Sequence, residues 1–93
     1  MIKSPTNLVI IEGKLVNKPI KQGEKTMFKI VSDDPKNNCI NLVFDIETKD
    51  RRVGKFVNDL LPRQDIKCTC ILGNKIVGNH VVPSLECYDI RLV

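Results

Sequence analysis

The sequence predicts an all-β domain with one helix, in the order β-β-β-α-β-β, and three observations support this prediction. Apolar and polar residues alternate in 25–32, 39–46 and 65–73, which is the period of half-buried strands. Segment 50–62 changes to the i, i+3, i+4, i+7, i+8 spacing of an amphipathic helix. With 93 residues and no repeat or linker, residues 1–93 form a single domain.

The first half of the chain contains three predicted strands. In 7–16, Val9 and Ile11 point inward while Leu8 and Ile10 point outward. After a turn containing Pro19 and Gly23, the strand at 25–32 has an inward face of Thr26, Phe28 and Ile30 and an outward face of Lys25, Met27 and Lys29. The strand at 39–46 places Ile40, Leu42 and Phe44 on one face and Cys39, Asn41 and Val43 on the other.

The second half starts with the helix. Asp50 is its expected N-cap, Pro62 stops it, and the apolar stripe comprises Val53, Phe56, Val57, Leu60 and Leu61. Gly54 lowers the helix propensity by about 1 kcal/mol relative to alanine. The strand at 65–73 points Ile66, Cys68, Cys70 and Leu72 inward, a hairpin with Gly78 and Asn79 at its tip follows, and 84–93 is the closing strand.

This element order is that of a five-stranded OB-fold barrel, a fold that binds oligonucleotides and oligosaccharides on its second and third strands and adjoining loops. A small SH3-like barrel is the alternative, although such barrels rarely carry a long helix between strands three and four. Barrel closure requires the first strand to pair with two neighbours, and Gly13 tolerates the bulge or bend that this needs.

Charge and cysteine content narrow the function. Fifteen basic and eleven acidic residues give a net charge of +4, and five lysines fall between 14 and 29, which favours an anionic partner. The spacing of Cys39, Cys68, Cys70 and Cys87 suits neither a zinc site nor paired disulfides, so they are interpreted as reduced structural residues. Without a signal peptide or an apolar run of about 20 residues, we expect a cytoplasmic location and no membrane contact. Since the sequence shows no metal-ligand cluster, no metal or other cofactor is expected.

The stretch NLVIIEGKLVNKPI resembles the opening of bacterial single-stranded DNA-binding proteins (SSB), with Asn7, Gly13, Leu15 and Pro19 at matching places. KTMFKIVSDD is similar to the second strand of that family, and FDIETKDRRVGKFVNDLLPRQDIKCTCILG to its strand-helix-strand unit. The primosomal replication protein PriB shares these motifs. The family generally carries several stacking aromatics and an acidic tail, whereas this chain has no Trp, three Phe and one Tyr and ends at Val93, so it looks like a tail-less variant such as PriB or a phage- or plasmid-encoded protein.

The expected function is non-catalytic binding of single-stranded nucleic acid, most readily DNA, in replication or recombination. Lysines would neutralise phosphates, and flat apolar groups would stack on bases. The candidate binding residues are Lys14, Lys18, Lys21, Lys25, Met27, Lys29, Asn41, Phe44, Lys75 and Tyr88. For Phe44, two interpretations remain: a core residue or a side chain that stacks on bases. Tyr88 could likewise stack on bases or lie on the barrel surface. The lysines could form a basic stripe that binds phosphates or simply a solvated strand face.

The alternative function is an OB-fold adaptor that binds a helicase or primase in a primosome or replisome, with weak or no DNA binding. An enzyme is not expected, since no catalytic Ser/His/Asp spacing, phosphate-binding glycine loop or metal cluster is present and His80 has no partner in sequence. Outward Leu8 and Ile10 predict a homodimer or larger homo-oligomer. Arg51 and Arg52 place positive charge at the start of the helix, where the helix dipole makes it mildly unfavourable. They could contact phosphates or the acids of a partner, or they could simply be exposed to solvent.

Overall fold

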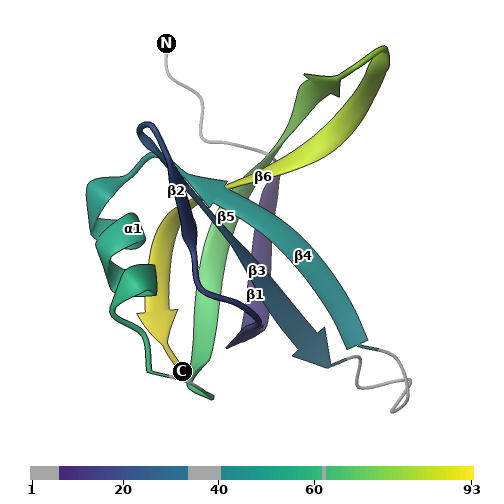
Figure 1. Cartoon of the computed structure of the whole chain (residues 1–93). Coiled ribbons are helices and arrows are strands. Elements are labelled where there is room, and N and C mark those ends of the chain that lie inside the picture. Colours follow the sequence, from purple (N-terminus) through teal and green to yellow (C-terminus); the bar gives the residue numbers. More distant parts are fainter. Residues whose placement is uncertain (1–6, 34–40, 62) are drawn as a thin grey trace, which may run out of the picture.

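The strands and the helix follow the predicted order, as seen in a computed structural model that describes residues 7–33, 41–61 and 63–93 (Figure 1). The elements are β1 Leu8–Leu15, β2 Ile20–Gln22, β3 Lys25–Asp33, β4 Asn41–Thr48, α1 Arg51–Asn58, β5 Asp65–Val77 and β6 His80–Leu92. The short β2 lies in the predicted turn and pairs only with β3. The other five strands close into a ring in the order β1-β5-β6-β4-β3-β1, which confirms the OB-fold barrel.

Closure takes place at the end of β1. Along Leu8–Lys14 this strand pairs with β5, and at Lys14 and Leu15 it also pairs with Val31 and Ile30 of β3. Gly13 precedes this double pairing, and a Cβ atom at its position would lie 2.1 Å from the carbonyl oxygen of Val31. The glycine is therefore required because the backbones of β1 and β3 approach closely at this point.

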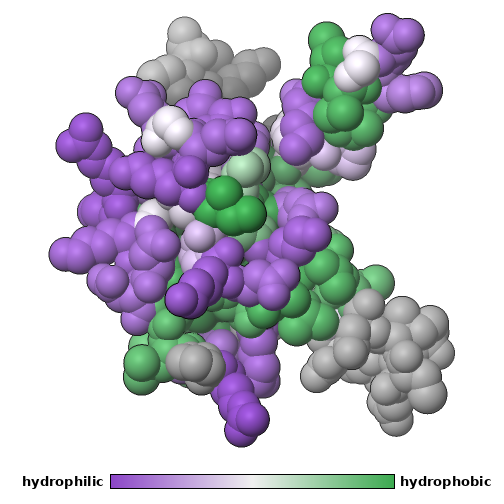
Figure 2. Space-filling view, viewed as in Figure 1, coloured by the Kyte–Doolittle hydropathy of each residue, from purple (hydrophilic) through white to green (hydrophobic). Residues whose placement is uncertain are grey.

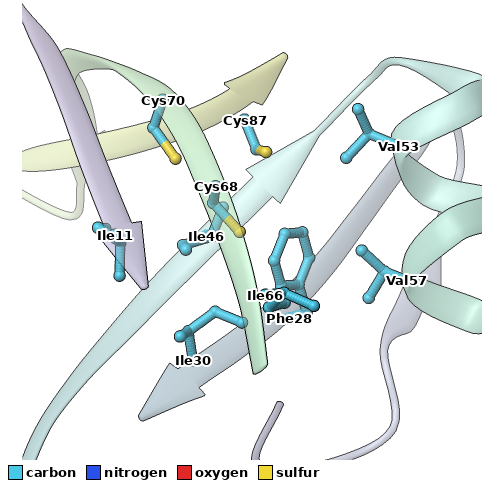
Figure 3. Close-up of a cluster of buried hydrophobic side chains, with 10 residues drawn as sticks. All are labelled: Ile11, Phe28, Ile30, Ile46, Val53, Val57, Ile66, Cys68, Cys70 and Cys87. Carbon is cyan, nitrogen blue, oxygen red and sulfur yellow. The ribbon is translucent and has the colours of Figure 1, made fainter. Parts of the chain in front are cut away.

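The core lies inside the ring and is mainly apolar, with Thr26 and Thr48 as its buried polar residues in the described part of the chain. Figure 3 shows the side chains of Val53 and Val57 pointing from α1 toward the residues inside the strands. The buried members of this core are Ile11, Phe28, Ile30, Ile46, Val53, Val57, Ile66, Cys68, Cys70 and Cys87. The predicted inward faces of β1 and β3 are confirmed, since Val9 packs against the core and Thr26 is buried as well.

Three cysteines form part of this core as free thiols. Cys68 and Cys70 of β5 lie beside Cys87 of β6, and Cys70 is directly opposite Cys87 in the register. Hydrogen bonding to Cys87 and burial raise the pKa of the Cys68 and Cys70 thiols well above the usual value. These residues thus pack as small hydrophobes, as predicted, while Cys39 lies outside the described residues.

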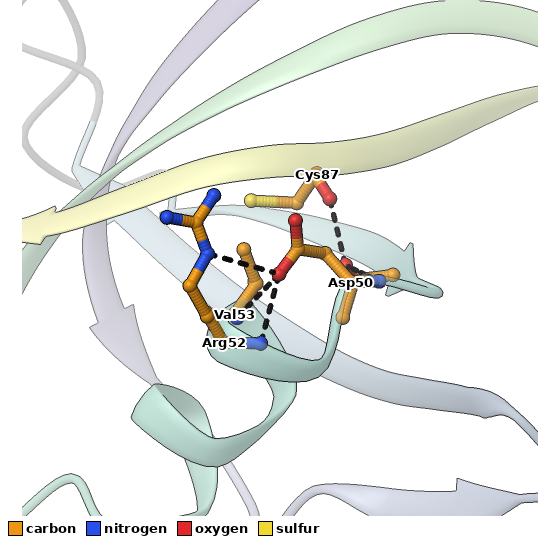
Figure 4. Close-up of polar contacts among 5 residues, drawn as sticks. Asp50, Arg52, Val53 and Cys87 are labelled. Carbon is orange, nitrogen blue, oxygen red and sulfur yellow. Dashed lines mark hydrogen bonds and ion pairs between the residues drawn. The ribbon is translucent and has the colours of Figure 1, made fainter.

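The helix closes one end of the barrel and is held by its cap. The Asp50 carboxylate accepts hydrogen bonds from the N–H groups of Arg52 and Val53, at 2.8 and 3.2 Å, which confirms the predicted N-cap (Figure 4). Gly54 is buried against β3, where a Cβ atom would lie 3.0 Å from the Thr26 hydroxyl oxygen. Gly54 is unfavourable for the helix, but its lack of a side chain permits close packing of the helix on β3.

The helix is shorter than predicted, because it ends at Asn58 and Asp59 forms its C-cap. Leu60 still packs against the core, but Leu61 is exposed, so its predicted place on the apolar stripe was wrong. Pro62, the predicted stop, lies outside the described residues. Among the residues that the structure describes, no helix is long and apolar enough to cross a membrane.

Thr48, the last residue of β4, contacts both β6 and the start of the helix. Its hydroxyl group donates a hydrogen bond to the carbonyl oxygen of Cys87 at 2.7 Å and accepts one from the N–H group of Asp50 at 3.1 Å. This contact stands beside the parallel pairing of Glu47 with Glu86, where β4 meets β6. A single buried side chain therefore links the contact between β4 and β6 to the start of α1.

The ends of β5 and β6 leave the barrel as a two-stranded arm (Figure 1). The arm pairs Gly73–Val77 with His80–Ser84 and turns at Gly78 and Asn79, as predicted. Leu72 is partly exposed because it stands where the arm departs, which corrects its expected inward position. Leu42 is likewise exposed, so the inner face of β4 is formed by Phe44 and Ile46.

Replacement of Gly13 with alanine tests the closure point. We expect Gly13→Ala to lower the free energy of unfolding by about 3 kcal/mol, since the new methyl group meets the backbone of Val31 and cannot be accommodated by a rotamer change. Urea unfolding measures this change. Gly73→Ala is the matched control, because its methyl group would meet only the rotatable Ser84 hydroxyl at 3.2 Å. Equal stabilities of the two variants would contradict the closure argument.

Candidate nucleic-acid interface

A groove of about 510 Å³ runs across the barrel between β3, β4 and the base of the arm. Its walls come from five parts of the chain: the turn before β2, β2 itself, β3, β4, and the hairpin of β5 and β6. The lining residues are Asn17, Lys18, Ile20, Met27, Phe28, Lys29, Asp45, Ile46, Glu47, Lys75, Val82, Pro83, Ser84 and Leu85. We call this the β3–β4 groove.

The floor of the β3–β4 groove is apolar without an exposed aromatic ring. Ile20 of β2 lies directly opposite Met27 of β3, so the two side chains share one face. Val82 and Pro83 approach from the arm. Phe28 also reaches the lining, but the side chain is buried in the core. Bases entering the groove would therefore rest on aliphatic, thioether and proline surfaces.

The charges of the groove are nearly balanced. Three lysines line it, Lys18, Lys29 and Lys75, together with two carboxylates, Asp45 and Glu47. Lys29 is opposite Asp45 in the register, with 3.6 Å between Nζ and Oδ1, and Lys25 stands 3.6 Å from Oε2 of Glu47. The outward lysines of β3 thus face acids on β4, which reduces the positive potential that phosphates would meet.

The structure brings four of the predicted binding residues together in the groove: Lys18, Met27, Lys29 and Lys75. Lys25 lies at its margin through the ion pair with Glu47. Lys21 is exposed on β2. For Asn41, only the backbone is described, paired with Asp33.

Three other predicted residues lie elsewhere. Lys14 does not line the β3–β4 groove; its ammonium group lies 2.7 Å from the Asp65 carboxylate at the barrel end where β1 meets β5. Phe44 is partly buried against the core and does not line the groove, so the core interpretation is the one the structure favours. Tyr88 sits in the register shift between β5 and β6, partly exposed on the barrel surface and outside the groove.

The sequence interpretation overlooked the acids and the arm. Asp45 and Glu47 alternate with Phe44 and Ile46, and this period alone places them outward on the strand next to Lys25 and Lys29. Val82 and Pro83 reach the groove only because β6 begins at His80 and pairs across the hairpin with Lys75 and Asn74. The predicted hairpin tip at Gly78 and Asn79 implies this pairing, but no local pattern shows that the hairpin lies beside β3 and β4.

The predicted oligomer residues lie on the outer face of the β1–β5 side. The side chains of Leu8 and Ile10 are 47% and 59% exposed, and Ile71, which pairs with Leu8, is also exposed. Among the described residues, β1 pairs from Leu8 to Gly13 only with β5, and Gly13 already lies against Val31 of β3, so the other edge of β1 is open from Leu8 to Glu12. An apolar patch and an open strand edge therefore occur together.

The described residues contain no group of three or more His, Cys, Asp or Glu side chains that could hold a metal ion. The polar chemistry of the β3–β4 groove is limited to ammonium groups, carboxylates and amide or hydroxyl side chains around an apolar floor. Such a surface can bind a chain that alternates anionic and flat apolar groups.

Comparison with known proteins supports the fold. No protein-family model matches the chain, and neither does any curated protein sequence. Among solved structures, the mitochondrial single-stranded DNA-binding protein Rim1 of S. cerevisiae is similar, in a selenomethionine-labelled form with a TM-score of 0.80 and 15% identity over 94% of each chain. Two further Rim1 structures give a TM-score of 0.74 and 16% identity, one over 94% of this chain and 93% of Rim1, the other over 92% and 94%. At this identity, the likeness establishes an SSB-like OB fold.

Proposed function

We propose that this protein binds single-stranded nucleic acid, most readily DNA, without catalysing a reaction. The observation that carries the proposal is the β3–β4 groove, an apolar floor bordered by Lys18, Lys29 and Lys75 on the strands and loops that OB folds use for ligands. The likeness to Rim1, which is a single-stranded DNA-binding protein, adds support. A role in replication or recombination, in the cytoplasm, is part of the same proposal.

The mode of binding follows from the groove. Ammonium groups at its border neutralise phosphates and release counterions, so the affinity is independent of sequence and decreases with salt. Met27, Ile20 and Pro83 contact bases through dispersion and hydrophobic burial rather than through aromatic stacking. The paired acids Asp45 and Glu47 keep this binding weak, and this feature favours the second candidate function, an adaptor for a helicase or primase.

Binding of fluorescein-labelled oligo-dT, followed by anisotropy, tests the proposal. With three lysines on phosphates, the logarithm of the affinity should fall with a slope of roughly −2 against log salt. We expect Lys18→Gln/Lys75→Gln to weaken binding about tenfold at low salt and to reduce this slope. Lys14→Gln/Lys67→Gln removes the same charge outside the groove and should change binding by less than about twofold.

An affinity no better than millimolar at low salt, or a salt slope of zero, would exclude single-strand binding and leave the adaptor function. Equal effects of the two double variants would show that net charge, and not the β3–β4 groove, determines the affinity.

Neutralising the groove acids should strengthen binding. We expect Asp45→Asn/Glu47→Gln to raise the affinity for oligo-dT about tenfold, because two repulsive charges are removed and Lys25 and Lys29 become available to phosphates. Asp89→Asn, which removes an acid paired with Arg91 on β6 outside the groove, is the control. Unchanged affinity of the groove variant would place the bound strand elsewhere.

We also propose a homo-oligomer, with a dimer as its simplest form, assembled through the outer face of β1. The open edge of β1 from residue 8 to residue 12 and the exposed Leu8 and Ile10 support this assembly. Light scattering at tens of micromolar should give at least twice the mass of one chain, and Ile10→Asp should give a single chain, because a buried unpaired charge opposes association. Val81→Asp, on the arm, is the control. A wild-type monomer would contradict this proposal.

A further inference from the structure

The positive charge of the protein is concentrated around α1 rather than in the β3–β4 groove. Residues 49–64 contain five basic side chains, Lys49, Arg51, Arg52, Lys55 and Arg63, against two acids, Asp50 and Asp59, a net +3 out of the +4 of the whole chain. The lining of the β3–β4 groove, with three lysines and two acids, carries +1. The groove between α1 and β6 also carries +1 in its own lining, from Arg52 and Lys55 against Asp59, and Lys49, Arg51 and Arg63 add positive charge around it. Figure 2 shows hydrophilic side chains crowded over α1 on the left of the molecule.

Most of these charges have no close counter-ion within the described part of the chain. Arg52 is 92% exposed, and its Nε lies 3.8 Å from the Asp50 carboxylate, which already caps the helix. No ion pair joins Arg51 or Lys55 to a carboxylate among the residues that the structure describes. The first turn of α1 also carries no acid, although acids are the residues that a helix N-terminus favours. The charge is therefore unnecessary for the stability of the helix.

An apolar groove lies next to this charge. It has a volume of about 380 Å³ and runs between α1 and the end of β6. Phe56, Leu60 and Leu92 form its apolar wall, and Arg52, Lys55, Asp59 and Gln64 surround them. Leu92 is 52% exposed, whereas Phe56 and Leu60 are half-buried. It shares no lining residue with the β3–β4 groove.

We propose that this groove, the α1–β6 groove, binds an acidic segment of a partner protein. An aliphatic side chain of the segment packs between Phe56, Leu60 and Leu92, and its carboxylates pair with Arg52 and Lys55. Charge complementarity selects this occupant: guanidinium and ammonium groups beside an apolar wall match carboxylates interspersed with aliphatic residues. A bare phosphate chain would leave the apolar wall of Phe56, Leu60 and Leu92 uncovered.

A synthetic peptide tests this inference independently of nucleic-acid binding. The probe is a fluorescein-labelled peptide of about twelve residues in which two leucines stand among glutamates and aspartates. Anisotropy at low salt should give a dissociation constant on the order of 10 to 100 µM, typical of a small interface. The same peptide with serines in place of the leucines should bind at least about fivefold more weakly, since the apolar wall is then unfilled.

Two variants locate the site. Arg52→Gln/Lys55→Gln should weaken binding of the leucine peptide about tenfold, and Leu92→Ser should reduce the difference between the leucine and serine peptides. Lys18→Gln/Lys75→Gln removes the same charge from the β3–β4 groove and should leave peptide binding unchanged. Because all of these side chains are exposed or at the edge of a groove, circular dichroism and the unfolding midpoint should match those of the wild type.

Three outcomes would overturn the inference: equal binding of the leucine and serine peptides, no effect of Arg52→Gln/Lys55→Gln, or an equal loss of peptide binding in Lys18→Gln/Lys75→Gln. A loss of oligo-dT affinity in Arg52→Gln/Lys55→Gln without a loss of peptide binding would assign the α1 charges to the nucleic acid instead. Failure of oligo-dT to bind the wild type would leave this inference intact while rejecting the proposed function.

Discussion

The close approach of β1 to β3 at Gly13 is the constraint on which the rest of the barrel depends. At this point one strand pairs with two neighbours, β5 and β3, so the sheet becomes a ring. The inner faces of β1, β3 and β5 meet inside this ring and form the core. The helix packs on that core, so its position also depends on the ring. The outer face of β3, with Met27 and Lys29, becomes one wall of the β3–β4 groove for the same reason.

The two grooves differ in their charges and in their apolar surfaces. The β3–β4 groove combines an apolar floor with lysines whose charge is offset by acids on the adjacent strand. The α1–β6 groove combines a smaller apolar wall with Arg52, which stands 3.8 Å from the capping Asp50, and Lys55, for which the described chain shows no ion pair. The two proposals therefore assign a different anionic ligand to each groove, one that presents bases and one that presents aliphatic side chains. The distribution of charge, and not its total, distinguishes the two.

The fold was predictable from the sequence because its signals are local. Alternation in β3 placed Phe28 and Ile30 inside, and Asp50 marked the start of the helix. The groove was predictable only in part. Lys18, Met27, Lys29 and Lys75 were identified, whereas Lys14 turned toward Asp65 because the last residues of β1 pair with β5 and β3 at the far end of the barrel. The hairpin that contains Val82 and Pro83 was predicted, but its place beside β3 and β4 depends on strands far apart in the sequence, so the contribution of these two residues to the groove could not be predicted.

The arm gives β5 and β6 two different environments along one continuous hairpin. From Ile66 to Cys70, β5 is paired on both sides and packed on the core, whereas from Asn74 to Val77 it pairs with β6 alone, and Ile76 and Val81 stand opposite each other with 76% and 68% exposure. A two-stranded ribbon without a core has little stability of its own. Amide hydrogens of the arm should therefore exchange through local opening, while those of the same strands within the barrel exchange only when the whole domain unfolds.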